Sequence, residues 1–340
     1  MLRNTTQVLA WFLAVNVALT APVYADPVVI ASAASIERSS ERFGFSAGSD
    51  DHICEMVTIP PVRLETQSKY DQTIMSKSVV DDAASRIRQQ ALAPIDDAIR
   101  RLEVMAVDTM TTATDQSIEC VARNLEAWAE AGALTDMATS DANLSRDRIM
   151  ASIAGLLLES RARGRDMAGQ SVVRPWLRSI ADQTIRYYDR NAGSISRRNN
   201  HRYWAGLSVG RIGYLLDDEG MLSWSRLSLD VGLCQVDREG FLPLELARGK
   251  KAFDYHLYAF VALRSLSALL SDDARVEKSS CAGGLERLQT RIENGLASIA
   301  SFESRSGYRQ DTPSRRNLLT ATRLSTRSQA ATRLRTSISY

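Results

Sequence analysis

The sequence predicts an all-α protein built from successive helical hairpins. Beyond residue 80, apolar residues recur mostly at three- and four-residue spacing, which is the pattern of a helix with one buried face. Strand-like alternation is scarce, and the joints between apolar segments carry Asp, Asn, Ser and Gly residues that favour helix ends and turns. We therefore expect one helical domain over residues 70–304. Periodicity alone leaves open whether its hairpins form a bundle, an open solenoid or a toroid.

Each predicted helix is recognised by its own apolar stripe. In the first, Ile87, Leu92 and Ile95 belong to one face, and the last runs from Phe253 to Leu270. Polar turn sequences separate the stripes. The apolar segments are 87–102, 125–133, 149–157, 176–188, 207–216, 222–233 and 253–270, and the turns lie at 141–145, 191–194, 217–220 and 237–240.

The regions on either side of the helical domain lack this pattern. Residues 26–69 contain breakers such as Pro60 and Pro61, so we expect mostly loop there. Residues 305–340 are rich in Ser, Thr and Arg, with eight Arg against the single Asp311. This composition predicts a basic tail that is partly disordered or a frayed terminal helix.

Length and composition exclude several classes of protein. A chain of 340 residues with 44% hydrophobic residues can bury a sizeable core, which excludes a disulfide-dependent miniprotein and a wholly disordered chain. The 42 Lys and Arg nearly balance the 40 Asp and Glu, for a net charge of +2. Bulk charge therefore gives no reason to expect a nucleic-acid partner.

The first 25 residues have the pattern of an export signal. Arg3 precedes an apolar stretch over residues 8–19, and a small-x-Ala cleavage site stands before Asp26. The stretch is short and interrupted by Asn16, so it does not predict a stable membrane span. We expect cleavage after residue 25 and a mature protein outside the cytoplasm, where disulfides form.

Four cysteines, Cys54, Cys120, Cys234 and Cys281, remain after that cleavage. None belongs to a Cys-x-x-Cys or similar spacing that would hold zinc, so we expect no metal site. Three pairings of four cysteines exist. We favour Cys54 with Cys120, which would tie the N-terminal loop to a helix.

Candidate site residues fall in three short stretches. In residues 196–204 a polar loop leads into a helix, which places Asn200 and His201 at or near a helix N-terminus. In residues 245–258, Tyr255 follows Arg248 by seven positions, so on a continuous helix they would share a face, with Tyr258 one turn further on. The third stretch, Ser68-Lys69-Tyr70, sets a cation beside an aromatic ring just before the first helix.

Together these groups suit the cleavage of an acidic polysaccharide by β-elimination. In a polymer of uronic acids, the negative charge of the neighbouring carboxylate makes the C5 proton hard to remove. Donors from Asn, Arg or Lys would neutralise that carboxylate and stabilise the enediolate. A neutral His or a Tyr phenolate can take the C5 proton while a Tyr protonates the departing oxygen. Hydrolysis would instead require two placed carboxylates, and no such pair stands out.

The same stretches resemble a known family. Residues 198–204 resemble the Asn-Asn-His-x-Tyr-Trp signature of the mannuronate-specific alginate lyases, polysaccharide lyase family 5. Residues 245–258 resemble the second motif of that family, residues 120–134 its Cys-bearing helix, and residues 68–70 its lid-proximal loop. The resemblance implies an all-α fold, an incomplete (α/α) toroid with a tunnel-like cleft. It also implies a periplasmic enzyme that works without a metal or other cofactor.

The resemblance also assigns roles and a disulfide. It implies that Asn200 and Arg248 neutralise the substrate carboxylate, that His201 is the base, and that Tyr255 is the acid, although a Tyr can serve as both in such enzymes. It maps the disulfide of the family onto Cys54 and Cys120. The basic tail, by contrast, does not resemble the closing helix of the family. The residues expected to contact substrate are Lys69, Tyr70, Arg198, Trp204 and Tyr258.

The leading hypothesis is therefore a lyase that cleaves β-1,4-linked mannuronate in alginate and leaves 4,5-unsaturated uronate ends. One alternative is a polyglucuronate lyase, and another is a non-catalytic polysaccharide-binding or scaffold protein of an exopolysaccharide secretion complex. In each case the expected partner is alginate or a related acidic polysaccharide. A polyanion requires local positive charge, which we expect from Arg197, Arg198, Arg202, Arg248, Lys250 and Lys251.

Overall fold

The structure is a computed structural model that describes residues 54–320, apart from residues 113–114, 163–165, 167–171, 272–278, 282, 316 and 319. The predicted export signal, residues 26–53 and residues 321–340 lie outside the described residues. Most of the described chain is helical, as predicted. Among the described residues, no helix combines the length and the apolar character needed to cross a bilayer.

Ten α-helices and two short strands are assigned over the described residues. The helices are α2 (Asp82–Thr112), α3 (Asp115–Glu130), α4 (Ser140–Ala162), α5 (Val173–Arg186), α6 (Asn200–Leu216), α7 (Glu219–Leu233), α8 (Pro243–Leu246), α9 (Ala252–Leu270), α10 (Gly283–Ala297) and α11 (Ala300–Ser306). A π-helical turn, η2 (Tyr187–Asn191), follows α5, and a 3-10 turn, η3 (Gly249–Lys251), precedes α9. The strands β1 (Arg63–Leu64) and β2 (Asp136–Met137) pair in parallel.

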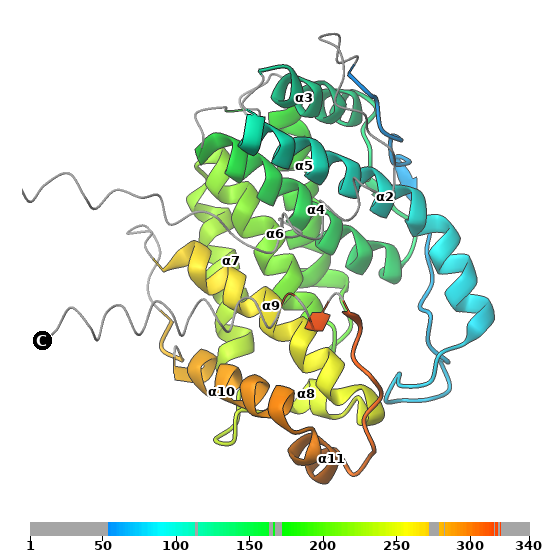
Figure 1. Cartoon of the computed structure of the whole chain (residues 1–340), viewed down its shortest axis with the longest axis vertical. Helices are drawn as coiled ribbons and strands as arrows, with labels where there is room; N and C mark the ends of the chain where they lie inside the picture. The colour runs from blue at the N-terminus through cyan, green and yellow to red at the C-terminus, as the bar shows by residue number, and fades with distance from the viewer. Residues whose placement is uncertain are drawn as a thin grey trace, which may run out of the picture.

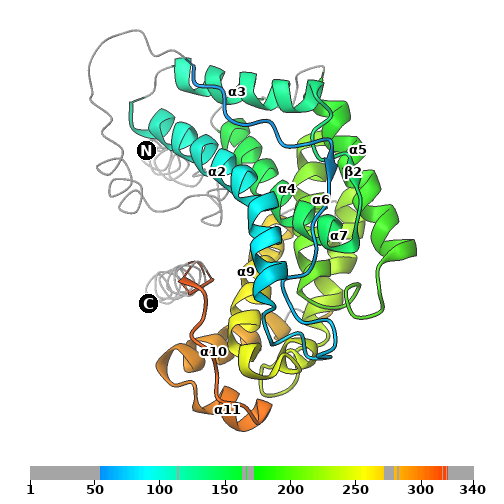
Figure 2. The same ribbon diagram turned by 90° about the vertical axis from the view of Figure 1, so that its right-hand side faces the viewer.

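The helices follow an open arc in which α6 is central. Helix α6 packs against α4, α7 and α9, while α2 packs against both α3 and α4. Figure 1 shows these helices stacked from α3 to α11, and Figure 2 shows the arc from the side. The described apolar core has two parts, one mainly around α2 to α6 and the other mainly around α6 to α11.

The position of α6 is fixed by local sequence. Asn199 caps the helix, because its side chain accepts a hydrogen bond from the His201 backbone N–H at 3.1 Å. Further along, a Cβ at Gly206 would lie 2.6 Å from the Ser228 side chain on α7. Small residues therefore allow α6 and α7 to pack closely, and this packing fixes the position of the α6 N-terminus.

Residues 54–81 form an anchored loop, and the first described helix begins only at Asp82. The Cys54–Cys120 disulfide joins this loop to α3, which confirms the favoured pairing. The loop folds back on itself, since the Asp71 N–H bonds the Val79 carbonyl at 3.0 Å. Tyr70 was expected just before the first helix, but eleven residues separate it from the start of α2 at Asp82.

Two further features concern the C-terminal half. A second disulfide, Cys234–Cys281, joins the end of α7 to the segment before α10. The expected boundary at residue 304 falls inside α11, and residues 308–315 then pack along η3 and the start of α9. This part of the predicted basic tail is therefore folded against the helical domain.

Candidate active site

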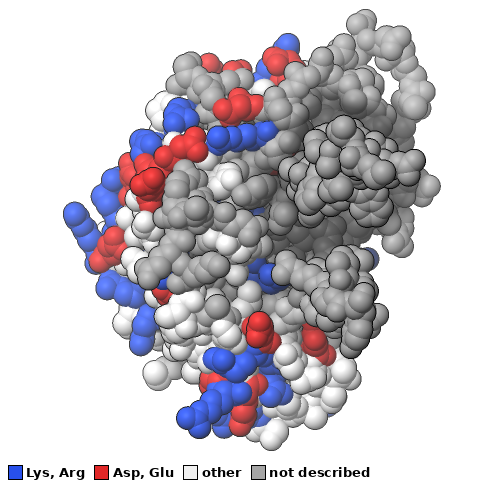
Figure 3. All heavy atoms as spheres, turned by 90° about the vertical axis from the view of Figure 1, so that its left-hand side faces the viewer, with Lys and Arg blue, Asp and Glu red and all other residues white. Residues whose placement is uncertain are grey.

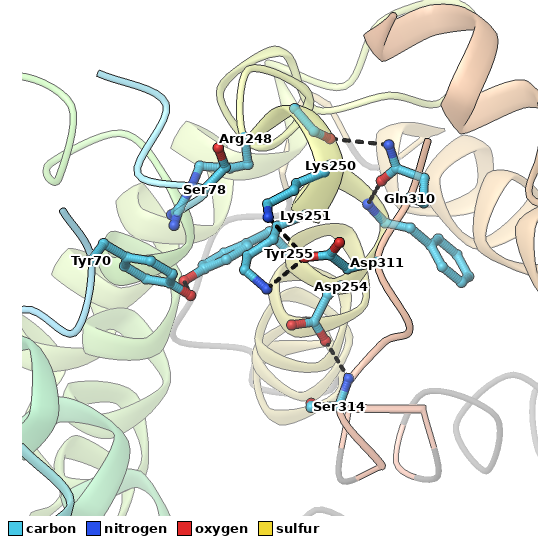
Figure 4. Close-up of polar contacts among 12 residues, drawn as sticks. Tyr70, Ser78, Arg248, Lys250, Lys251, Asp254, Tyr255, Gln310, Asp311 and Ser314 are labelled. Atoms are coloured by element: carbon cyan, nitrogen blue, oxygen red, sulfur yellow. Dashed lines mark hydrogen bonds and ion pairs between the residues drawn. The ribbon is translucent and has the colours of Figure 1, made fainter. Parts of the chain in front are cut away.

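Tyr70, Tyr255 and Arg248 form the centre of the candidate site. The two phenolic oxygens lie 2.6 Å apart, and the Arg248 guanidinium lies 3.6 Å from the Tyr255 ring centroid and 5.0 Å from that of Tyr70. Figure 4 shows the three side chains grouped on one side of α9. A second bond, from Arg248 Nη2 to the Lys77 carbonyl at 2.6 Å, joins the guanidinium to the loop. The N-terminal loop thus contacts Arg248 and Tyr255 directly, through Tyr70 and the Lys77 carbonyl.

The prediction of one continuous helix from Arg248 to Tyr255 is wrong. Helix α8 ends at Leu246, and the chain turns through η3 before α9 begins at Ala252. The turn requires a left-handed backbone at Gly249, where φ is +57°. The turn nevertheless folds Arg248 back onto Tyr255. The two side chains are therefore in contact as predicted, although they do not lie on one continuous helix.

His201 lies at the N-terminus of α6, as predicted. Burial lowers the pKa of His201 to about 4, reinforced by the positive charges of Arg248 and Arg88 and opposed by the carboxylate of Asp141. The imidazole is therefore neutral at physiological pH and has a lone pair that can accept a proton. Its backbone carbonyl accepts a hydrogen bond from the Tyr188 hydroxyl at 3.0 Å, which holds this turn of the helix.

The pKa of Tyr255 is shifted in the opposite direction to that of His201. Burial raises the pKa of the Tyr255 phenol, although the nearby Arg248 and Lys69 charges oppose the shift. The phenol is therefore protonated and can act as an acid. A neutral base and a protonated acid near the same guanidinium are the pair of proton-transfer groups that an elimination requires.

Asn200 is fully buried and is bound to Glu245. Its side-chain nitrogen lies 3.0 and 2.9 Å from the two Glu245 carboxylate oxygens, and its backbone N–H donates to one of them at 2.8 Å. Burial raises the pKa of Glu245, while the bonds from Asn200 and the charge of Arg248 lower it. In this orientation the Asn200 amide donates to Glu245, and its Oδ1 has no hydrogen-bond partner in the described chain.

The predicted aromatic residues form a continuous run beside these groups. The Trp204 and Tyr258 rings stack with centroids 4.9 Å apart, and Tyr258 meets Tyr255 edge-on at 6.4 Å. Tyr255 in turn lies 6.4 Å from Tyr70. Aromatic faces with hydroxyl groups at their edges suit the apolar faces and hydroxyls of sugar rings.

The remaining predicted residues divide between the site and other surfaces. Lys69 Nζ lies 5.3 Å from the Tyr70 ring, and its charge acts on Tyr255. Arg198 is exposed, and its Nε bonds the Ser194 carbonyl within the turn before α6. The structure therefore places Lys69 beside Tyr70, whereas the Arg198 side chain makes its bond within a local turn.

The predicted concentration of positive charge is only partly present. The prediction for Arg202 is wrong, because its guanidinium is buried 3.7 Å from the Trp224 ring centroid and bonds Ser228, both on α7. Lys250 and Lys251 pair with the Asp311 carboxylate. On the described part of the face in Figure 3, basic and acidic side chains are interspersed.

The sequence reasoning missed Arg88, Asp141 and Glu245. Arg88 Nε bonds Asp141 at 3.1 Å, and both charges act on His201. Asp141 belongs to a recognisable turn sequence, and Glu245 opens the second motif. The sequence therefore drew attention to both residues but did not indicate which side chains they contact. Arg88 stands in an amphipathic helix, where nothing in the sequence distinguishes it from a solvated arginine.

Three polar atoms of this cluster lack a hydrogen-bond partner in the described chain. Asn200 Oδ1, Trp204 Nε1 and Arg248 Nε are buried and make no hydrogen bond within the described part of the chain. Within that same part, no three His, Cys, Asp or Glu side chains group as a metal site would need. The arrangement can bind an anion beside aromatic faces and transfer protons on either side of it.

Comparisons with known proteins identify related chains. Residues 148–276, which include Asn200, His201, Arg248 and Tyr255, match the alginate lyase family. An alginate lyase of Pseudomonas paraeruginosa is 29% identical over 278 residues, covering 80% of this chain and 74% of the relative. A polysaccharide lyase of Stenotrophomonas maltophilia is 27% identical over 257 residues, covering 74% of this chain and 76% of the relative.

Solved structures share the fold. A variant of alginate lyase A1-III in complex with a tetrasaccharide superposes with a TM-score of 0.65 and 18% identity, covering 86% of this chain and 84% of the other. Alginate lyase A1-III from Sphingomonas species A1 gives 0.60 and 17%, with the same coverage. These matches confirm the predicted fold class, an all-α incomplete (α/α) toroid. The matched domain, the relatives and the shared fold together support an alginate lyase.

Proposed function

We propose that this protein is a polysaccharide lyase that cleaves β-1,4-linked mannuronate in alginate by β-elimination, leaving 4,5-unsaturated uronate ends. The observation that carries the proposal is the grouping of a neutral His201 and a protonated Tyr255 around the Arg248 guanidinium. The relatives named alginate lyase support the choice of polymer.

The chemistry follows from the charges of these groups. Arg248 pairs with the carboxylate of the sugar and stabilises the enediolate that forms when the C5 proton leaves. His201 takes that proton, and the substrate carboxylate beside it makes the imidazole a stronger base than in the free protein. As the C4–O4 bond breaks, the electron pair forms the C4=C5 double bond. Tyr255 gives its proton to the departing O4, and both groups then return to their starting states by proton exchange with solvent.

We also propose that residues 1–25 direct the chain to the periplasm, where an exported polyuronate lyase would meet its substrate. The apolar stretch and the cleavage site before Asp26 support this proposal. Fractionation of cells that express the full chain, followed by N-terminal sequencing of the mature protein, tests it. A mature protein that stays in the cytoplasm with Met1 intact would contradict it.

The function is tested by the ultraviolet absorbance of the unsaturated product on three polymers measured side by side. We expect a rise with polymannuronate, and little with polyguluronate or polyglucuronate. The matched control is Tyr255→Phe protein purified in the same way, which excludes a contaminating lyase. A larger rise with polyglucuronate would replace the proposed substrate, and no rise with any polymer between about pH 6 and 9 would remove the proposed activity.

A further inference from the structure

Residues 308–314, here called the C-terminal strap, cross the turn that joins Arg248 to Tyr255. The sequence placed this segment in a divergent basic tail, yet Figure 4 shows it against η3 and the first turn of α9. The strap begins where the Tyr308 ring covers Gly249, so closely that a Cβ on that glycine would lie 3.3 Å from a ring carbon. The strap therefore covers the left-handed glycine of the turn.

Gln310 supplies caps that the turn does not supply itself. Neither η3 nor α9 has a side-chain cap from its own N-cap residue. Gln310 Oε1 accepts a hydrogen bond from the Phe253 N–H at 3.0 Å, and Gln310 Nε2 donates to the Gly249 carbonyl at 3.0 Å. One side chain, 57 residues further along the chain than Phe253, thus satisfies backbone groups on both sides of the helix start.

Asp311 and Ser314 extend the same contact. The Asp311 N–H donates to the Lys250 carbonyl at 2.8 Å, and its carboxylate lies 3.0 Å from Lys251 Nζ. The Ser314 N–H donates to Asp254 Oδ1 at 2.9 Å. Of the six residues between Arg248 and Tyr255, five bond the strap, at positions 249, 250, 251, 253 and 254.

This contact matters because Arg248 has little else to fix it. Its Nε is buried without a partner in the described chain, and its guanidinium rests on the Tyr255 and Tyr70 rings and on one loop carbonyl. The four-residue helix α8 and a left-handed glycine precede α9, so Arg248 stands in a turn between two helices and not within a regular helix. A shift of about 1 Å in a group that stabilises the transition state can lower a rate a hundredfold.

We propose that the C-terminal strap, through Gln310 and Asp311, positions Arg248 relative to Tyr255 for the reaction. These two are positioning residues, since they act through the turn and do not touch the reacting atoms. The proposal rests on the lyase function proposed above, and adds to it a requirement for a segment outside the matched family domain.

The test compares the full-length variants Gln310→Ala and Asp311→Ala with the control Thr312→Ala, an exposed neighbour in the strap. Initial rates on polymannuronate give kcat and KM, and hydrogen exchange of the peptide covering residues 249–254 is measured without substrate. We expect kcat to fall roughly tenfold or more in both variants, with KM changed less than about threefold, because a misplaced Arg248 stabilises the transition state less. Exchange in the peptide should rise in both variants, and the control should match the wild type in every measurement.

A conservative variant separates positioning from general stability. Gln310→Glu keeps the acceptor for the Phe253 N–H but loses the donor to Gly249, so it should recover part of the lost kcat. Variants that lower the melting temperature but keep the kcat of the control would overturn the proposal, as would unchanged exchange in the peptide. If the wild type is active and the variants match it, the strap does not position Arg248, and the proposed function is unaffected. An inactive wild type removes the proposed function itself.

Discussion

The phenolic oxygens of Tyr70 and Tyr255 lie 2.6 Å apart although the residues are 185 positions apart in sequence. Each ring also faces the Arg248 guanidinium. The N-terminal loop therefore contributes directly to the environment of the proposed acid. A change on either side of this contact is expected to alter proton transfer.

Replacing Tyr255 by Phe removes the proposed acid while keeping the ring beneath Arg248. We expect kcat on polymannuronate to fall about 100-fold or more, because general acid catalysis contributes that much in many enzymes. Binding of the polymer, measured by calorimetry, should change little, since the lost group acts in proton transfer. A near-normal rate in this variant would overturn the role of Tyr255.

Replacing Tyr70 by Phe tests the contact between the two phenols. The variant keeps the aromatic ring against Arg248 but leaves the Tyr255 hydroxyl without its partner. We expect a loss of about fivefold in kcat, equivalent to one hydrogen bond of about 1 kcal/mol. Steady-state kinetics beside Tyr308→Phe, which alters an exposed phenol of the strap, provide the matched comparison. Equal rates in the two variants would show that the Tyr70 hydroxyl has no part in the reaction.

The pH dependence of activity tests the state of His201. Burial and the charges of Arg248 and Arg88 lower the pKa of His201 to about 4, so the base loses its function only when the pH falls far enough to protonate it. The acid limb of kcat/KM should therefore lie at about pH 4 to 5, below the ordinary histidine value of about 6.5. Arg88→Gln removes one of the positive charges and should move this limb upward. A limb at or above the ordinary value in the wild type would contradict the assigned environment.

Local chemistry made part of this site predictable from the sequence. The Asn199–His201 start of α6 was predictable because capping depends on adjacent residues, and the structure shows that cap. Arg248 and Tyr255 were expected together for a reason that was wrong. Their contact arises from a turn around Gly249, and a left-handed glycine inside a helical pattern leaves no clear signal in the sequence.

Long-range contacts explain what could not be predicted. Nothing near Tyr70 in sequence indicates that its hydroxyl meets Tyr255, and nothing near Gln310 indicates that it caps Phe253. Arg202 was expected to add positive charge to the site, yet it lies one step along the helix from His201, and each step turns a side chain by about 100°. That rotation places its guanidinium on Trp224 in the interface with α7.

Glu245 provides the last test, because it decides which way the Asn200 amide faces. As a carboxylate it can only accept, so it holds the Asn200 nitrogen and leaves Oδ1 unpaired. Glu245→Gln offers a donor as well as an acceptor. The Asn200 amide can then turn, accept from the new amide through Oδ1, and present its own nitrogen to a substrate carboxylate.

We therefore expect Glu245→Gln to fold and to keep at least the activity of the wild type. Glu245→Ala should instead lose both stability, by about 1–3 kcal/mol for buried donors without partners, and most of its activity. Thermal melting and kcat on polymannuronate measure the two effects, with the exposed Glu239→Gln as control. If Glu245→Gln is as inactive as Glu245→Ala, the negative charge itself is required, and Asn200 acts in the orientation described above, with its nitrogen held by the carboxylate.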